Sequence, residues 1–356
     1  MGRREETLCF APPRRHRMRG CLLWLLFFAA VCLGAVMVVN LSQQKQVRLI
    51  KQPVSVLGLP QELEGFSILH ISDLHGALLG EGQAMIQTAI GTASYKAVCI
   101  TGDMVGKDGD YRPFLQLLSL LKQDVPILFI PGDEDPDPVF TAAHDTLNVL
   151  ASYITAAQAA GAVYLDAPYP LAVGKTTLWF SPEGLYTVNA ETTIASCQSQ
   201  LDKLNALNTA ATPDGEAERK ALEYRLDAAQ RLLAARAQMK STDLHIALTH
   251  APLTYEYVRS VWEWDVGEGP ALKDVTLALA GHLCGGQYRL PGAGALYVPG
   301  YGLFPEDSLI TGFARVSTIA QYVSPGLGSS GFYPLEPGRL FNPPTITLVT
   351  LTGKPQ

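Results

Sequence analysis

The chain has 356 residues, of which 17% are charged, and its formal net charge is −6. It carries no basic stripe beyond the N-terminal region, so we expect no nucleic-acid partner. The six cysteines form no CxxC pair and no regular spacing, which argues against a disulfide framework. Roughly 300 residues follow the distinctive N-terminal segment, enough for one large domain or two small ones.

Residues 21–39 form an uncharged apolar run. As a helix rising ~1.5 Å per residue, this run can cross a hydrocarbon core of ~30 Å. Six arginines precede it and few basic residues follow it closely. This asymmetry predicts a cytoplasmic basic tail over 1–20, a single-pass transmembrane anchor in the cell membrane over 21–39, and an extracytoplasmic main domain.

Two other interpretations of this segment stay open. A cleaved signal peptide is one, although the run is longer than a usual signal core and no clear small-residue cleavage site follows it. A buried core helix is the other. Residues 40–52 are expected to form a linker, and the polar, proline-containing lead-in to the main domain extends to residue 63.

Three short apolar runs follow, at 66–71, 97–100 and 126–130. Between them, the segments 81–94 and 111–123 have the apolar spacing of helices. The alternation of strand and helix predicts βαβ units and a largely parallel sheet. In such sheets the functional residues gather at the carboxyl ends of the strands, which is where this chain has acidic turns.

The second half of the chain contains further short strand signals. They cover residues 162–165, 177–180, 245–249, 275–280, 295–298, 312–316, 321–323 and 345–351. We expect these strands to form a second βα lobe that antiparallel strands complete.

Two amphipathic segments interrupt the strand pattern at about 190–240. Apolar residues recur every three or four positions on both sides of the turn at 212–215. This spacing predicts an inserted antiparallel helical hairpin. The hairpin is either a structural insert that packs on itself or a lid or partner-binding element.

Five polar clusters follow predicted strands. Each is common by itself, since an Asp-x-His or a Gly-Asp turn is more often structural than metal-binding. Together, at the strand ends of one fold, their carboxylates, imidazoles and thiol predict a site for two first-row divalent ions. The clusters are Asp73 to His75, Asp103, Asp133 to Asp135, His250, and His282 to Cys284.

In this order, the clusters resemble the motifs of the calcineurin-like metallophosphoesterases: D-x-H, G-D, G-N-H-D/E, a histidine and G-H-x-H. The segments 285–291, 322–328 and 339–348 are similar to the bacterial membrane-associated branch of that superfamily. The resemblance covers about residues 53–353 apart from the insert. It implies an α/β protein, a four-layer α/β/β/α sandwich with two mixed sheets and with metals at its edge.

The resemblance also implies roles for single residues. One metal would bind Asp73, His75, Asp103 and Cys284, and the second would bind Asp103, Asp133, His250 and His282. A hydroxide bridging the metals would hydrolyse a phosphomonoester or phosphodiester, with Asp103 and Glu134 as the catalytic residues. Arg289 is the candidate for substrate binding. An anchored enzyme would favour substrates at the membrane, such as lipid-linked phosphoesters.

Three positions depart from the family pattern. Asp133 replaces a neutral Asn ligand, Glu134 replaces the His that assists the leaving group, and Cys284 replaces the second His of G-H-x-H. A thiolate favours zinc or iron over manganese. It also brings the ligand charge to four negatives, which balance two divalent ions and weaken the attraction for a phosphate anion. The alternative function is therefore a degenerate family member that binds metal or ligand without efficient turnover.

The run at 326–331 matches GxGxxG. No βαβ unit contains it and no long helix follows it, so it does not predict a dinucleotide-binding site.

Overall fold

The structure is a computed structural model that describes residues 15–140, 149–206, 212–331 and 338–354, with side chains from residue 21 onward. The chain divides into two compact units, Met1–Gln43 and Gln44–Gln356.

The N-terminal unit consists mainly of one helix, α1 (Arg15–Gln44). Its segment Cys21–Gln44 is long and apolar enough to cross a membrane, and none of it is buried. A signal sequence near the N-terminus would have the same character. With its ends at Arg15 and Gln44, α1 extends beyond the apolar run at 21–39 in both directions. Arg3, Arg4 and Arg14 of the expected basic tail lie outside the described residues.

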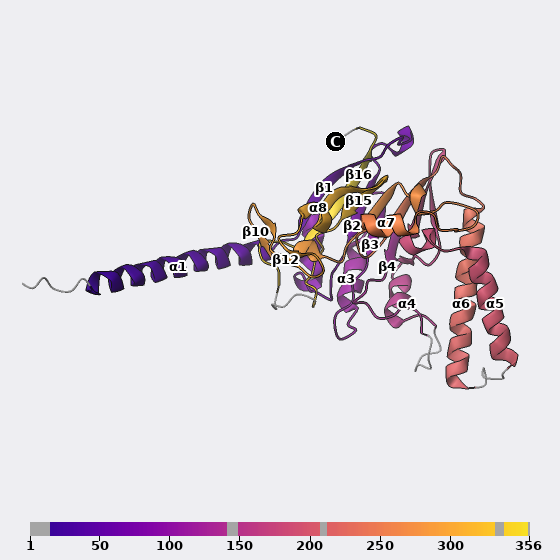
Figure 1. The fold of residues 1–356 in the computed structure, drawn as a ribbon, viewed down its shortest axis with the longest axis horizontal. Coiled ribbons are helices and arrows are strands. Elements are labelled where there is room, and N and C mark those ends of the chain that lie inside the picture. The colour runs from indigo at the N-terminus through magenta and orange to yellow at the C-terminus, as the bar shows by residue number, and fades with distance from the viewer. Residues whose placement is uncertain (1–14, 141–148, 207–211, 332–337, 355–356) are drawn as a thin grey trace, which may run out of the picture. The chain divides into compact units, whose positions relative to one another are not determined.

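Within the described residues, the second unit contains two six-stranded sheets (Figure 1). The first has the order β1 (Arg48–Ser55), β16 (Thr345–Thr352), β2 (Ser67–Ile71), β3 (Ala97–Thr101), β4 (Ile127–Ile130) and β5 (Val163–Tyr164). Strands β2 to β5 are parallel to one another. Strand β16 runs antiparallel to β2 and parallel to β1.

The second sheet has the order β14 (Gly312–Val316), β15 (Ile319–Val323), β9 (Leu277–Ala280), β8 (Leu244–Leu248), β7 (Thr176–Pro182) and β6 (Tyr169–Val173). Its four central strands are parallel, and the edge strands β14 and β6 are antiparallel to their neighbours. Both sheets are therefore mixed, as the resemblance implied.

Successive side chains of a strand point to opposite faces, and this alternation divides the first sheet between two cores. In β2, Ile68 packs in the core between the two sheets, while Leu69 packs in the core beneath the helices. In β3, Cys99 and Val98 divide in the same way. The helices over the outer face are α2 (Ala84–Ile90), α3 (Arg112–Leu120) and α4 (Ser152–Ala159).

The second sheet carries its own helical layer. Ala247 of β8 and Ala278 of β9 pack with Val258 and Val261 of α7 (Tyr255–Val261). The order of the layers is thus helix, sheet, sheet, helix, which confirms the predicted four-layer sandwich. Short 3-10 turns complete it at η1 (Gln61–Leu63), η2 (Glu81–Gln83), η3 (Glu183–Tyr186), η5 (Leu272–Asp274) and η6 (Cys284–Gly286).

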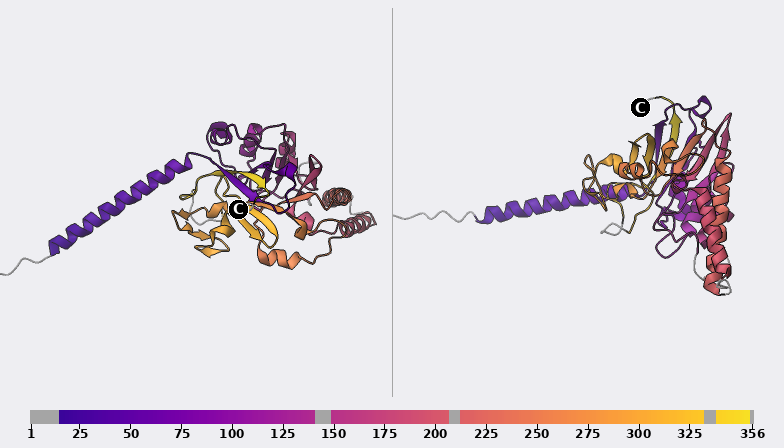
Figure 2. Two further views of the ribbon diagram at one scale, coloured as in Figure 1. Left: turned by 90° about the horizontal axis from the view of Figure 1, so that it is seen from above. Right: turned by 45° about the vertical axis from the view of Figure 1, so that its right-hand side comes forward.

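The predicted hairpin is present as α5 (Ala190–Ala206) and α6 (Pro213–Arg236), which lie side by side (Figures 1 and 2). The predicted turn at 212–215 instead begins α6, because the Thr212 side chain accepts a hydrogen bond from the Gly215 backbone N–H and so caps the helix. The connection at 207–211 lies outside the described residues.

Buried and paired arginines fasten α6 to the sandwich. Arg236 is 5% exposed and donates to the carbonyl oxygens of Leu185, Val188 and Val266. Arg231 forms a two-bond ion pair with Asp166, in the segment between β5 and β6. These contacts favour the structural interpretation of the insert.

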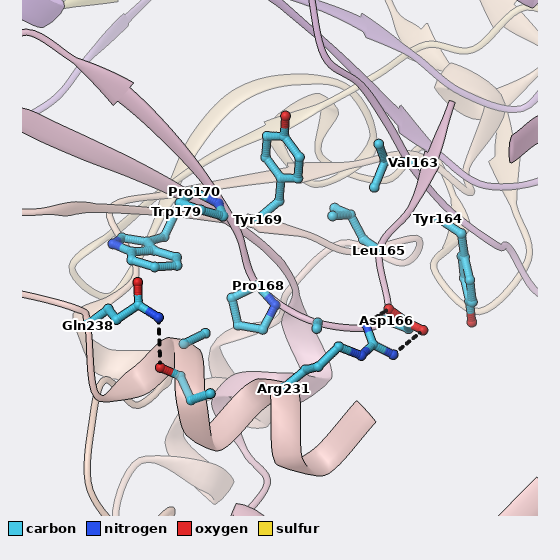
Figure 3. A pocket seen from close by; sticks show the side chains of 13 residues that line it. Val163, Tyr164, Leu165, Asp166, Pro168, Tyr169, Pro170, Trp179, Arg231 and Gln238 are labelled. Atoms are coloured by element: carbon cyan, nitrogen blue, oxygen red, sulfur yellow. Dashed lines mark hydrogen bonds and ion pairs between the residues drawn. The ribbon is translucent and has the colours of Figure 1, made fainter. Parts of the chain in front are cut away.

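A pocket of about 340 Å³ lies between α6 and the β5–β6 segment (Figure 3). Its lining includes Tyr169, Trp179 and Arg231, and includes none of the predicted metal ligands. The Arg231 guanidinium nitrogens are engaged by Asp166 and Asp227. The pocket is therefore a feature of the insert and lies apart from the predicted chemistry.

Other features differ from the sequence predictions. Strand β1 occupies part of the expected linker and lead-in. It was not predicted, because this polar edge strand buries few of its side chains. Strands β5 and β16 join the first sheet rather than the second lobe. The expected strand at 295–298 is divided between two hairpins. These short elements are β10 (Arg289–Leu290), β11 (Gly294–Ala295), β12 (Tyr297–Val298), β13 (Gly302–Leu303) and the helix α8 (Asp307–Ile310).

Candidate metal centre

The seven predicted metal ligands lie in loops that follow strands of both sheets. Two follow β2, one follows β3, one follows β4, one follows β8 and two follow β9: Asp73, His75, Asp103, Asp133, His250, His282 and Cys284. The loops touch directly, since the backbone N–H of His282 donates to Asp73 Oδ1 at 2.7 Å. The fold therefore brings residues more than 200 positions apart to one place.

One group of ligand atoms comes from Asp103, Asp133, His250 and His282, and these atoms lie within 4.8 Å of one another. His250 Nε2 is 2.6 Å from Asp133 Oδ1. His282 Nδ1 is 3.0 Å from the same oxygen and 3.2 Å from His250 Nε2. Two imidazole nitrogens and two carboxylates thus share one small volume, a donor set that suits a first-row divalent ion.

A second group comes from Asp73, His75 and Cys284, also within 4.8 Å. Cys284 Sγ lies 3.5 Å from His75 Nε2. Asp73 and Cys284 are fully buried. This set of one oxygen, one nitrogen and one sulfur could hold a first-row divalent ion.

Asp103 lies between the two groups. Its Oδ1 accepts a hydrogen bond from the Glu134 backbone N–H at 2.8 Å. Its Oδ2 is 3.1 Å from His250 Nε2 and 3.8 Å from His75 Nε2, and this buried atom has no well-aligned hydrogen bond among the described residues. An acceptor oxygen without a donor that faces both groups fits a ligand shared by two cations.

The loops hold several ligands in unusual backbone conformations. A positive φ is uncommon for residues with a side chain and marks strained positions that gather at functional sites. Five of the seven predicted ligands have φ between 45° and 73°: Asp73, His75, Asp103, His282 and Cys284.

A backbone hydrogen bond fixes the ring orientation of His250. Its Nδ1–H donates to the carbonyl oxygen of Thr101 at 2.7 Å, which leaves Nε2 directed at Asp103 and Asp133. Such a contact selects the tautomer that can bind a metal.

The electrostatics of the site also favour cations. Burial lowers the pKa of His75, but the neighbouring Cys284 and Glu134 outweigh it and raise the pKa to about 11. Burial likewise opposes the charged form of His250, and Asp103 and Asp133 raise its pKa to about 11. The imidazoles of His75 and His250 therefore take up protons at neutral pH in the metal-free site, because the neighbouring acidic groups favour their charged form.

Glu134 lies beside this cluster with both carboxylate oxygens engaged. Its Oε2 is 3.3 Å from His75 Nδ1, an ion-pair contact whose angle falls short of a well-aligned hydrogen bond. Its Oε1 accepts a hydrogen bond from Ser330 Oγ. Burial raises the pKa of Glu134, but these partners outweigh it and lower the pKa to about 2. Glu134 is thus an ionised carboxylate, whereas a leaving-group acid needs a raised pKa.

Arg289 is placed near the site but is engaged by protein groups. Its guanidinium donates to the carbonyl oxygen of Gly285 at 2.9 Å and pairs with Asp307 at 2.6 Å. These contacts fix the loop that carries Cys284. A role of Arg289 in substrate binding stays a prediction.

Two parts of the site were not predicted. Ser330 belongs to the glycine-rich run at 326–331, which packs against the D-x-H loop. A Cβ added to Gly326 would meet the Asp73 Cβ at 2.8 Å, and one added to Gly328 would meet the Leu74 carbonyl oxygen at 2.2 Å. Lys107 is the other. A Cβ added to Gly331 would lie 3.1 Å from Lys107 Nζ and 4.0 Å from Glu134 Oε2, so Gly331 separates these two side chains. The spacing of the glycines was a signal for close packing rather than for a nucleotide.

Comparison with known proteins adds a family assignment. The model of the family described as calcineurin-like phosphoesterase matches residues 66–285, more than half of the chain. A search of curated proteins gave no match. Among solved structures, the chain is similar to the phosphopantetheinyl hydrolase PptH from Mycobacterium tuberculosis, with 14% identity over 74% of this chain and 91% of that chain and a TM-score of 0.37. A likeness this distant bears on neither activity nor substrate.

Proposed function

Because the chain belongs to the calcineurin-like phosphoesterase family, we propose that it is a membrane-anchored, metal-dependent hydrolase of a phosphomonoester or phosphodiester. The family membership confirms the resemblance that the motifs predicted. The observation that carries the proposal is the pair of ligand groups with Asp103 Oδ2 between them.

Each residue of the site has a role in this proposal. Asp73, His75 and Cys284 would hold one cation, and Asp133, His250 and His282 would hold the other, with Asp103 shared. Two divalent ions bound there would act as Lewis acids on a phosphoryl oxygen. His250 would be kept in its binding tautomer by Thr101, and His75 would be oriented by Glu134. Because Cys284 supplies a soft thiolate, we propose zinc or iron rather than manganese.

The proposed location follows from α1. Its length and composition suit a membrane span, and the arginines before residue 21 favour a cytoplasmic N-terminus with the second unit on the opposite side. A tethered hydrolase meets membrane-borne substrates most often, which favours a lipid-linked phosphoester.

The test is metal analysis of the purified full-length chain together with hydrolysis assays on generic phosphomonoesters and phosphodiesters. We expect about two divalent ions per chain, as in a two-metal site, and loss of most metal and at least ~10²-fold of activity in Asp103→Asn. Asp166→Asn, at the ion pair with α6, is the matched control and should keep both. A chain without metal would contradict the proposal.

A second candidate function is binding without turnover. It is favoured by the ionised state of Glu134 and by the thiolate and extra carboxylate among the ligands. A metal-loaded protein that hydrolyses none of these substrates would support this candidate.

A further inference from the structure

Three large apolar side chains are exposed on the short elements that follow β10. Leu303 of β13 is 70% exposed, the adjacent Phe304 is 57% exposed, and Leu309 of α8 is 45% exposed. We call these three residues the apolar tip. Single exposed apolar residues are ordinary, but three within seven positions form a feature that needs a partner.

The backbone presents the apolar tip in a defined conformation. Phe304 has φ of 49°, and its N–H donates to the Leu296 carbonyl oxygen at 3.0 Å. An aromatic residue in this region of φ is strained, and the hydrogen bond keeps it there.

The short elements that bear the apolar tip pack onto the loop that carries Cys284. Leu283, Ala295, Val298 and Ile310 form one small buried cluster. A Cβ added to Gly286, two residues after Cys284, would lie 2.5 Å from Ala295 Cβ and 3.1 Å from Ile310 Cγ2. The elements that bear the tip therefore adjoin the metal centre.

The chain enters the second unit at Gln44, which lies near the loop that carries Cys284. Gln44, the last residue of α1, donates from Nε2 to the Asn342 carbonyl oxygen at 3.4 Å. Asn342 Nδ2 in turn donates to the Cys284 carbonyl oxygen at 2.8 Å. Whatever direction α1 takes, its covalent link to Gln44 keeps this end of the second unit close to the point where the chain leaves the membrane.

Helix geometry sets a length for this link. The apolar run ends at Val39, and five further helical residues to Gln44 extend ~8 Å at ~1.5 Å per residue. That length is comparable with the headgroup layer, which adds roughly 5–8 Å to each side of a ~30 Å hydrocarbon core. Residues next to Gln44 thus lie within reach of the lipid headgroups.

We propose that the apolar tip enters the outer part of the bilayer that holds α1, so that the metal centre opens onto the membrane surface. The partner is the lipid itself. No Lys or Arg occurs between Arg289 and Arg315, so the contact depends on apolar burial and not on anionic lipid. The inference rests on the proposed membrane span of α1, and it deepens the proposed function by making the substrate a phosphoester carried in the headgroup layer.

Leu57 is a matched control position. It is 94% exposed and follows β1, which runs away from Gln44 over eight residues. At ~3.3 Å per residue the strand ends ~23 Å from its start, and Leu57 lies two residues beyond that end. Two exposed leucines on the same unit, one near the anchor and one far from it, can therefore be compared.

The experiment uses the full chain in phosphatidylcholine nanodiscs, with Cys9, Cys21 and Cys32 replaced by alanine. An environment-sensitive fluorophore is attached to Leu303→Cys or to Leu57→Cys, and lipids with a spin label high on the acyl chain serve as quenchers. We expect the label at 303 to lose at least about half of its emission, as a group ~5–10 Å below the headgroup surface should. The label at 57 should lose none. Equal quenching at the two positions would overturn the inference.

Two further measurements separate this inference from the proposed function. Phe304→Asp should lower hydrolysis of a phosphodiester lipid in the same nanodiscs at least tenfold and leave hydrolysis of a soluble phosphodiester unchanged. Equal effects on both substrates would overturn the inference while the hydrolase proposal stands. Release of the chain from membranes by alkaline carbonate would refute the anchor and the inference together, and the soluble assay would still test hydrolysis.

Discussion

The Oε2 atom of Glu134 lies 3.3 Å from Nδ1 of His75, while the other ring nitrogen of His75, Nε2, faces Cys284. A carboxylate in this position selects the tautomer in which Nε2 is free to bind a metal. Glu134 is thus in a position to orient His75, a role different from that of the imidazole it replaces in the family pattern.

We therefore predict that Glu134→Gln lowers the affinity for the metal held by His75 and Cys284 roughly 10- to 100-fold. Cobalt titration followed by the thiolate-to-cobalt absorption band reports this site, because Cys284 is its only sulfur ligand among the described residues. Ser330→Ala, which removes the hydroxyl donor to Glu134, should have a smaller effect in the same direction. An unchanged titration with a large loss of rate at saturating metal would indicate a leaving-group acid instead.

Metal binding should release protons. The pKa values of His75 and His250 are raised from 6.5 to about 11 in the metal-free site, so both rings are charged near neutral pH. Only neutral imidazole binds a metal, so binding should displace up to about two protons and grow stronger as pH rises. Calorimetry at pH 7 in buffers of different ionisation enthalpy measures this release. Binding heats that do not depend on the buffer would contradict the pKa shifts.

The same shifts predict the pH dependence of the metal-free fold. A histidine with a raised folded pKa stabilises the native state fully below its unfolded pKa of 6.5, and this stabilisation is lost as pH rises toward about 11. The denaturant concentration at the unfolding midpoint of chelator-treated protein should therefore decrease as the pH is raised from 7 to 10. In His75→Gln this fall should be smaller, and an identical profile in both proteins would show that His75 does not contribute.

The ligand charges should set metal preference and rate. Asp133→Asn with Cys284→His removes two negative charges and the thiolate. We expect the double variant to shift its preference from zinc toward manganese and to hydrolyse phosphodiesters at least ~10-fold faster, a recovery of ~1.4 kcal/mol. Turnover of both proteins across several metals provides the measurement. A wild type that is already fast with manganese, and a variant that is no faster, would show that these departures are neutral.

The two arginines of α6 should differ in their contribution to stability. Arg236→Met leaves one buried and two partly buried carbonyl oxygens without their donor and should lower the free energy of unfolding by roughly 2–4 kcal/mol. Arg231 has a side chain that is 42% exposed, so Arg231→Met should cost less than ~1 kcal/mol. Denaturant unfolding compares the two. Equal losses would mean that the ion pair with Asp166 holds the insert as firmly as Arg236 does.

The sequence predicted the parts of the fold whose signal is local. Strands β2, β3 and β4 are short apolar runs that end in acidic turns, and their positions were predicted to within a residue or two. The hairpin was predicted because both of its helices have a regular apolar spacing. Strand β1 was not, because it lies at an edge, contains Pro53 and buries little, so it lacks the alternation that identifies a strand.

Long-range partners could not be read from the sequence. The residue types of β16 suit either sheet, and only the fold determines that it pairs with β1 and β2. The predicted ligands do converge, which followed from their positions after strands. The contact between Ser330 and Glu134 joins residues 196 positions apart and has no motif of its own. Likewise, nothing near Arg289 in the sequence showed that Asp307 would pair with it.

The position of β16 has a consequence for how the protein is made. β1 follows α1 closely in the chain, yet its neighbour in the sheet is a strand synthesised about 300 residues later, at a pace of ~5–20 residues per second. β2 must also wait for β16 on one side. Until translation reaches residue 352, the first sheet has open strand edges. Completion of this sheet is therefore a late event, and chains interrupted before β16 should be recognised as unfinished by the quality-control machinery of the compartment in which they fold.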